Sequence, residues 1–177
     1  MPRALLTPGG PAPTEIPRLV RDAQHGDREA FAELYRRFAR MVHGIVLARV
    51  VRTDVDDVVQ DVFVTALDRL GQLREPAAFG GWLAAIARHR ATDHSRRAPA
   101  TEVLADDATS IRDPDRLEAL AILDTVRSLP DAYRETLMLR LVEGMSGAEI
   151  AERTGLTAAS VRVNLHRGMK LLREKLT

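Results

Sequence analysis

The chain of 177 residues contains no cysteine, which excludes disulfide bonds and thiolate metal sites. Aromatic residues make up only 4% of the sequence, so the core must be built from leucine, valine, isoleucine and alanine, as in helical bundles. No apolar run reaches membrane-spanning length, and prolines interrupt the N-terminus where a signal peptide would be continuously apolar. We therefore expect a cytoplasmic protein in which residues 1–17 form a disordered tail.

Strand-like alternation is also missing, and apolar residues instead recur at intervals of three and four. This spacing predicts an all-α fold. The predicted helices cover residues 18–25, 27–51, a stretch that begins at Thr53 or Asp54, 79–97, 117–129 and 131–142, followed by two more at the C-terminal end.

Glycines, prolines and caps divide these helices. Gly26 should end the first helix and Asp27 should cap the second. The third helix should bury a stripe of apolar residues that extends to Leu67. Residues 98–116 are rich in acids, contain two prolines and have no helical period, so they predict a flexible acidic linker. The linker would join two small helical domains, residues 18–97 and 117–177.

Residues 146–177 have the pattern of a helix-turn-helix that ends in a basic helix. Ala151 suits a close helix crossing, Gly155 a sharp turn, and Val161 the contact that joins the two helices. Thr157 is the expected N-cap of the second helix. From there on, five basic residues stand against one glutamate, as insertion into a DNA major groove requires. A helical hairpin with a solvated basic face would show the same pattern.

Residues 54–68 carry five aspartates and no lysine or arginine. Asp54, Asp57 and Asp61 share one helix face, where they could hold a divalent metal for phosphoryl chemistry. The acids could instead form a solvated face near the positive end of the helix, or a docking face for a basic partner. No HExxH motif, phosphate loop or nucleophile motif accompanies them, and the histidines are scattered. We therefore expect no catalytic residue, metal or cofactor.

The helix predicted at residues 79–97 starts with Phe79 and Trp82 and carries four arginines. Aromatic rings next to arginines can stack unpaired bases while the cations hold phosphates. The rings could equally fill the core while the arginines are solvated. The second basic unit near the C-terminus favours nucleic acid.

Three motifs in order resemble the extracytoplasmic-function (ECF) sigma factors of the sigma-70 family. They are DVDDVVQDVF from Asp54, FGGWLAAIARHRATDHSRR from Phe79, and the C-terminal helix-turn-helix. The resemblance covers about residues 19–175. It implies sigma domain two and sigma domain four on a linker that enters polymerase channels. It also implies a bacterial cytoplasmic protein that binds core RNA polymerase, recognises promoter DNA at the −35 and −10 elements, and supports melting and transcription initiation.

The resemblance implies roles for individual residues. The acidic helix would dock on the clamp-helix coiled coil of the largest polymerase subunit through Asp56, Asp57, Gln60, Asp61 and Phe63, the last of these being more internal. The loop at residues 70–78 and the helix after it would capture the −10 element through Gln72, Arg74, Phe79, Trp82, Arg88, Arg90, Arg96 and Arg97. The last helix would read the −35 element through Ser160, Arg162, Val163, Asn164, His166, Arg167 and Lys170.

Several residues depart from the family pattern. Val163 and Asn164 replace a small polar residue and an arginine, Met169 replaces a second arginine, and His89 stands where asparagine is usual. These departures imply fewer phosphate contacts and an altered base preference.

The resemblance further implies a protein that is monomeric when free, is not inserted in a membrane, and has an anti-sigma factor as an inhibitor. The rival interpretation is a stand-alone dimeric helix-turn-helix transcriptional regulator. Such a regulator would bind palindromic half-sites about one helical turn apart.

Overall fold

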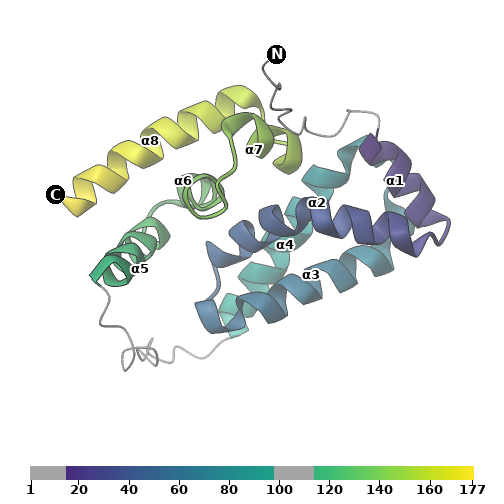
Figure 1. The fold of residues 1–177 in the computed structure, drawn as a ribbon, viewed down its shortest axis with the longest axis horizontal. Helices are drawn as coiled ribbons and strands as arrows, with labels where there is room; N and C mark the ends of the chain where they lie inside the picture. The colour runs from purple at the N-terminus through teal and green to yellow at the C-terminus, as the bar shows by residue number, and fades with distance from the viewer. Residues whose placement is uncertain (1–14, 98–113) are drawn as a thin grey trace, which may run out of the picture.

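The structure, a computed structural model, describes residues 15–97 and 114–177 (Figure 1). Within these ranges every regular element is a helix or a helical turn, which confirms the all-α prediction. The first unit consists of α1 (Glu15–Gln24), α2 (Arg28–Leu47), α3 (Val55–Arg69) and α4 (Phe79–Arg97), with short 3₁₀ turns η1 (Arg52–Asp54), η2 (Leu70–Gln72) and η3 (Pro76–Ala78). The second unit consists of α5 (Pro114–Arg127), α6 (Asp131–Leu137), the π turn η4 (Met138–Val142), α7 (Gly147–Thr154) and α8 (Ala158–Leu176).

Several helix ends follow from local chemistry. The backbone N–H groups of Glu29 and Ala30 donate to the Asp27 side chain, so the predicted cap of α2 is present. Gly26 has a φ of 94°, in the left-handed region that glycine adopts without strain, and it closes α1 as predicted.

Three details of the first unit differ from the predictions. Helix α2 ends at Leu47, four residues earlier than residue 51. The sequence suggested Thr53 or Asp54 as the cap of α3. Asp54 occupies the N-cap position but makes no capping hydrogen bond; its carboxylate accepts from the Thr53 hydroxyl and from His94 in α4, the latter at 2.8 Å. Leu67 is 52% exposed rather than buried. Val59, Phe63 and Leu67 lie in one row along the edge of the buried stripe; the first two are buried, and Leu67, at the end of the row, reaches solvent.

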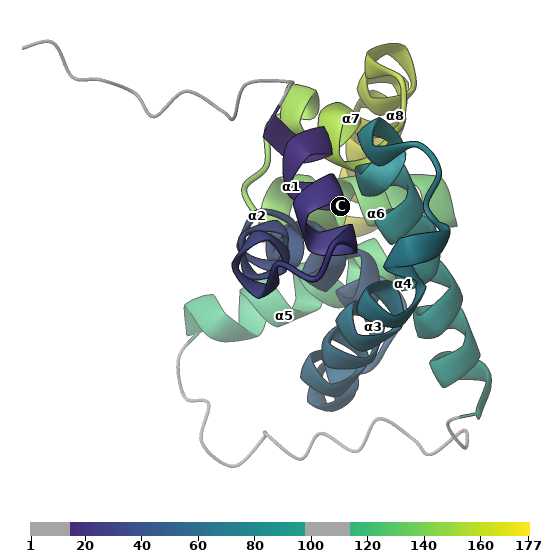
Figure 2. The same ribbon diagram turned by 90° about the vertical axis from the view of Figure 1, so that its right-hand side faces the viewer.

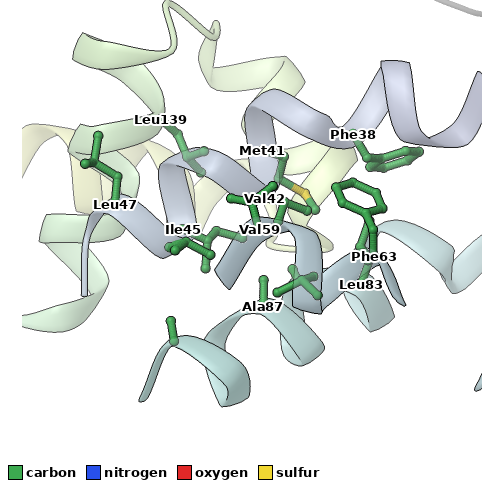
Figure 3. Packing of buried hydrophobic residues seen from close by; sticks show 14 of the residues in the cluster. Phe38, Met41, Val42, Ile45, Leu47, Val59, Phe63, Leu83, Ala87 and Leu139 are labelled. Carbon is green, nitrogen blue, oxygen red and sulfur yellow. The ribbon is translucent and has the colours of Figure 1, made fainter. Parts of the chain in front are cut away.

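Helix α2 is the centre of the first unit, with α1, α3 and α4 packed around it. Figure 3 shows its buried side chains, among them Met41, Val42 and Ile45, facing those of α3 and α4. Phe38 of α2 meets Phe79 of α4 edge to face, with ring centroids 5.1 Å apart. This packing fixes the angle at which α3 and α4 present their outer faces.

The second unit is built around the crossing of α8 with α6 and α7. Gly168 of α8 lies so close to α6 that a Cβ there would stand 3.1 Å from the Leu137 side chain. Ile150 of α7 and Val161 of α8 are buried, as expected for a helix-turn-helix.

The two units pack against each other and share one hydrophobic cluster (Figures 1 and 2). The π turn η4 lies against α2, and α7 lies against α2 and α4. In Figure 3, Leu139 of η4 points toward α2 of the first unit. The sequence predicted two helical units but gave no sign of this contact. Most of the predicted tail and most of the predicted acidic linker fall in residues 1–14 and 98–113, outside the described ranges. The remaining residues of both are helical, because α1 begins at Glu15 and α5 begins at Pro114.

Candidate functional site

The outer face of α3 is acidic and exposed. Four of the predicted docking residues on this helix are exposed, namely Asp56, Asp57, Gln60 and Asp61. Phe63 is buried and packs against Tyr35 of α2, with ring centroids 4.4 Å apart. The fifth predicted residue therefore supports the face from beneath.

Beside these acids runs an apolar groove of about 420 Å³ between α2 and α3. Its lining includes Asp56 and Gln60 together with the exposed side chains of Tyr35, Val64 and Leu67. Sequence reasoning missed these three apolar residues. Exposed apolar side chains grouped beside charged ones are typical of protein-binding surfaces.

Asp54 does not belong to this face. The hydrogen bond from His94 holds the pKa of Asp54 below its ordinary value, as does a weaker one from Thr53. The bond ties the start of α3 to the end of α4. Across residues 15–97 and 114–177 no group of three or more histidine, aspartate or glutamate side chains is placed to hold a metal ion.

The loop before α4 is fixed by the first unit. The amide of Gln24 donates to the carbonyl oxygens of Leu70 and Leu73 at 3.0 and 2.8 Å. The side chains of Gln72 and Arg74 remain exposed on this loop. The loop thus presents polar side chains on a held backbone, directly before α4.

The predicted nucleic-acid residues of α4 differ in exposure. Phe79 is fully buried and Trp82 is half-buried. Their ring centroids lie 5.9 Å apart, so Phe79 supports Trp82 from the core. Arg96 and Arg97 are exposed at the end of the helix, and Arg90 is half-buried. Arg88 is engaged by Glu135 of the second unit at 2.7 Å. The structure therefore places Phe79 in the core and Arg88 between the two units.

The helix-turn-helix is locally well specified. Ser146 and Glu149 form a reciprocal capping box at the start of α7, and the hydrogen bond from the Ser146 backbone lowers the pKa of Glu149. Gly155 has a φ of 75° and ends α7, as the sequence indicated. Thr157 caps α8 by accepting from the backbone N–H of Ser160, as predicted.

One side of α8 is buried and the other is open. Val161, Gly168 and Leu172 are buried against the other helices of the second unit. Asn164 is half-buried, and its amide donates to the hydroxyl of Thr136 in α6 at 3.5 Å. The remaining predicted residues are exposed, namely Ser160, Arg162, Val163, His166, Arg167 and Lys170. They form one solvent-facing surface with three formal positive charges.

The described part of the chain contains no helix that is both long and apolar enough to cross a membrane.

The structure presents three surfaces: an acidic and apolar one on α3, a basic and aromatic one at the loop before α4 and on α4, and a basic one on α8.

The chain matches two parts of a known family. Residues 34–100 match Sigma-70 region 2, and residues 119–172 match Sigma-70, region 4. The first match contains most of α2, α3 and α4, and the second contains most of α5 to α8.

Similar proteins span nearly the same length. The ECF RNA polymerase sigma-E factor of Haemophilus influenzae is 33% identical over 89% of this chain and 93% of its own. The ECF RNA polymerase sigma-E factor of Escherichia coli K12 is 30% identical over 89% of this chain and 92% of its own.

A solved structure shows the same relationship. The structure of CnrH in complex with the cytosolic domain of CnrY is 28% identical in sequence, covers 92% of this chain and 97% of that chain, and has a TM-score of 0.65. Since both regions match in family order and the relatives match over most of their length, the chain belongs to the ECF sigma factors of the sigma-70 family, the subunits that direct RNA polymerase to promoters.

Proposed function

We propose that the three surfaces divide the work of this sigma factor. The α3 face docks on core RNA polymerase, the loop and α4 hold the melted −10 element, and α8 reads the −35 duplex. The observation that carries the proposal is the exposure of complementary chemistry at each surface: acids on α3, and cations on α4 and α8.

The α3 face combines two kinds of contact. The carboxylates of Asp57 and Asp61 attract a basic partner and orient it, while the groove at Tyr35 and Leu67 accepts apolar side chains. Burial of apolar side chains contributes affinity, and the charges fix the orientation of the partner, so the two together specify a docking surface. The docking residues are Asp56, Asp57, Gln60 and Asp61, with Phe63 as their buried support.

Charge reversal tests this assignment. The double variant Asp57→Arg and Asp61→Arg should bind core polymerase at least tenfold more weakly, because each change replaces attraction by repulsion. Glu118→Arg, a charge reversal at an exposed position of α5, is the control and should bind normally. Equal binding of all three proteins, measured by fluorescence anisotropy, would remove the docking face from α3.

At the second surface, Gln72 and Arg74 lie on a held loop and Trp82 follows on α4. Extruding a base from the duplex costs a few kcal/mol, which stacking and hydrogen bonds in a pocket must offset. Arg90, Arg96 and Arg97 would hold the phosphates of the melted strand, joined by Arg88 when it is released from Glu135. Phe79 acts from beneath, as support for Trp82.

At the third surface, Arg162 and Arg167 are placed to contact the −35 duplex, since arginine pairs with guanine in the major groove. Val163 and His166 lie on the same exposed side and contribute to base preference. Ser160 and Lys170 would hold the backbone. Asn164 acts by holding α8 against Thr136, and its amide would read a base only after that contact breaks.

Members of this family are generally DNA-recognition subunits without catalysis, and we propose the same for this chain. RNA synthesis would belong to the polymerase, in the bacterial cytoplasm. We expect a monomer when free and an anti-sigma protein as inhibitor. The complex of the similar protein CnrH with CnrY supports a protein partner. The stand-alone dimeric regulator is not favoured, because region 2 matches alongside the helix-turn-helix.

A further inference from the structure

The side chain of Gln24 joins the end of α1 to the loop at residues 70–78. Its amide nitrogen donates to the carbonyl oxygen of Leu70 at 3.0 Å and to that of Leu73 at 2.8 Å. A side-chain amide has two N–H groups, so both of its donors are used on this one loop. The two bonds span 46 and 49 positions of the chain, and they therefore tie the loop to a helix that is remote in sequence.

The two bonds fix the backbone on both sides of the exposed residues Gly71 and Gln72. The Leu70 carbonyl belongs to the peptide group before Gly71, and the Leu73 carbonyl belongs to the peptide group before Arg74. The N–H of Leu73 also donates to the Leu70 oxygen at 3.1 Å, which closes the turn η2. The side chains of Leu70 and Leu73 are buried. Gln72 and Arg74 are thus exposed on a backbone that is held at two peptide groups.

Without Gln24 this part of the backbone would have more freedom. Gly71 lies inside the span that the two bonds enclose, and a Cβ at Gly71 would stand in open space, so packing does not restrain it. Glycine also has a wider range of backbone conformations than any other residue. The amide of Gln24 therefore supplies a restraint that the residues of the loop do not supply themselves.

Helix α1 is itself held in place, so Gln24 is a fixed donor. Arg37 of α2 donates to both carboxylate oxygens of Glu15, at the start of α1, at 3.0 and 2.9 Å. Leu19 and Val20 of α1 are buried, and the helix also lies against η2 and η3. The position of the loop is thus set by the core of the first unit, through α1, as well as by the ends of the loop.

A loop that is already in its binding conformation favours the capture of an extruded base. Extrusion costs unstacking energy, which contacts with the base must offset. Ordering a free loop at the same moment adds a further cost, and preorganisation removes that cost. Since both N–H groups of Gln24 are bonded to the loop, the residue acts through the loop and does not need to touch DNA.

We propose that Gln24 is a positioning residue for the −10 element: by clamping two loop carbonyls, it holds Gln72 and Arg74 in the conformation that meets an extruded base. This inference rests on the proposed function of the loop and α4. It gives α1, which carries none of the proposed DNA contacts, a part in promoter recognition.

Gln24→Met tests the clamp, because methionine has a similar shape but no N–H donor. The measurement is fluorescence anisotropy of the complex with core polymerase, bound to the single non-template strand of a promoter that run-off transcription has located. Losing both hydrogen bonds should raise the Kd about tenfold. His25→Met is the matched control, because it introduces the same side chain one position later, where the ring bonds to Arg21 and not to the loop.

A scan with abasic nucleotides separates positioning from damage to the fold. The same strand is prepared with one base at a time removed across the −10 element. Where the captured base is missing, the conformation of the loop has nothing to meet, so Gln24→Met and the unaltered protein should bind equally. At the other positions the difference between the two proteins should persist. Partial unfolding would instead weaken binding to every strand alike.

Gly71→Ala restrains the loop by a second route. Its Cβ would meet no atom within 4 Å, and its φ lies outside the left-handed region, so alanine fits the backbone. Replacing glycine by alanine at such a position removes conformational freedom from the chain. Added to Gln24→Met, this change should recover about two- to fivefold of the lost affinity.

Three results would overturn the proposal: unchanged binding of Gln24→Met, an equal loss of affinity on every abasic strand, or no recovery by Gly71→Ala. Failure of the proposed function would look different. In that case the double variant Gln72→Ala and Arg74→Ala would bind as tightly as the unaltered protein, because the loop would not contact the strand at all.

Discussion

Replacing Glu135 with glutamine should lower the free energy of unfolding by about 3 kcal/mol. Removing one partner of a buried ion pair costs about 3–5 kcal/mol, because the other charge stays buried without compensation. The carboxylate of Glu135, which is only 6% exposed, accepts from Arg49 of the first unit at 2.8 Å and from Arg88 at 2.7 Å. Arg49 is only 10% exposed and carries most of this effect, while Arg88 is 32% exposed and is partly relieved by solvent. The lower end of the range therefore applies.

In a chain of this size such a loss corresponds to a fall of about 6–12 °C in melting temperature. Urea unfolding followed by circular dichroism measures the free energy, and a thermal scan measures the temperature. The triple variant Arg49→Met, Glu135→Leu and Arg88→Met provides the internal check. It should recover stability to within about 1 kcal/mol of the unaltered chain, because removing all three charges removes the desolvation cost as well.

The reasoning would be refuted if Glu135→Gln cost less than about 1 kcal/mol, the size of a surface pair. It would also be refuted if the triple variant were no more stable than the single one. In that case Glu135 would be only a packing element of the contact between the units.

Other expected outcomes follow from single sites. The hydrogen bond to Glu143 raises the pKa of His43 above its ordinary 6.5. The contribution of this pair to the free energy of unfolding is therefore fully present below pH 6.5 and is lost as pH rises through the higher folded-state pKa. Urea unfolding across this range should show the free energy of unfolding falling with pH, and His43→Gln should flatten that fall. Gly155→Ala forces a Cβ into the left-handed region and should cost about 1–2 kcal/mol in the same assay, with Gly147→Ala near neutral. Arg162→Ala should cost about 1–3 kcal/mol at one base pair of the −35 site in quantitative gel shifts; an equal loss on every sequence would make Arg162 a phosphate contact.

Local signals allowed much of the fold to be predicted. Asp27, Gly26, Gly155 and Thr157 act on neighbours within a few residues, so their capping and turn roles could be read from spacing alone. The side-chain cap expected at Thr53 or Asp54 is not formed by Asp54, whose carboxylate bonds instead to His94, 40 positions away, where local spacing gives no signal.

The contact between the units could not be predicted for the same reason. Glu135 looks like any acid on an amphipathic helix, and its partners stand 86 and 47 positions earlier. The apolar part of the docking groove escaped notice because Leu67 follows the spacing of buried residues and differs only in how far the stripe extends. On α8, spacing could not show that Asn164 bonds to Thr136.

Transcription with purified core polymerase tests the central claim most directly. Run-off transcription on genomic fragments should give discrete products only when the protein and core polymerase are both present, and the Asp57→Arg and Asp61→Arg double variant should abolish them. Products that form equally without the protein, or that persist at full yield with the double variant, would contradict the account.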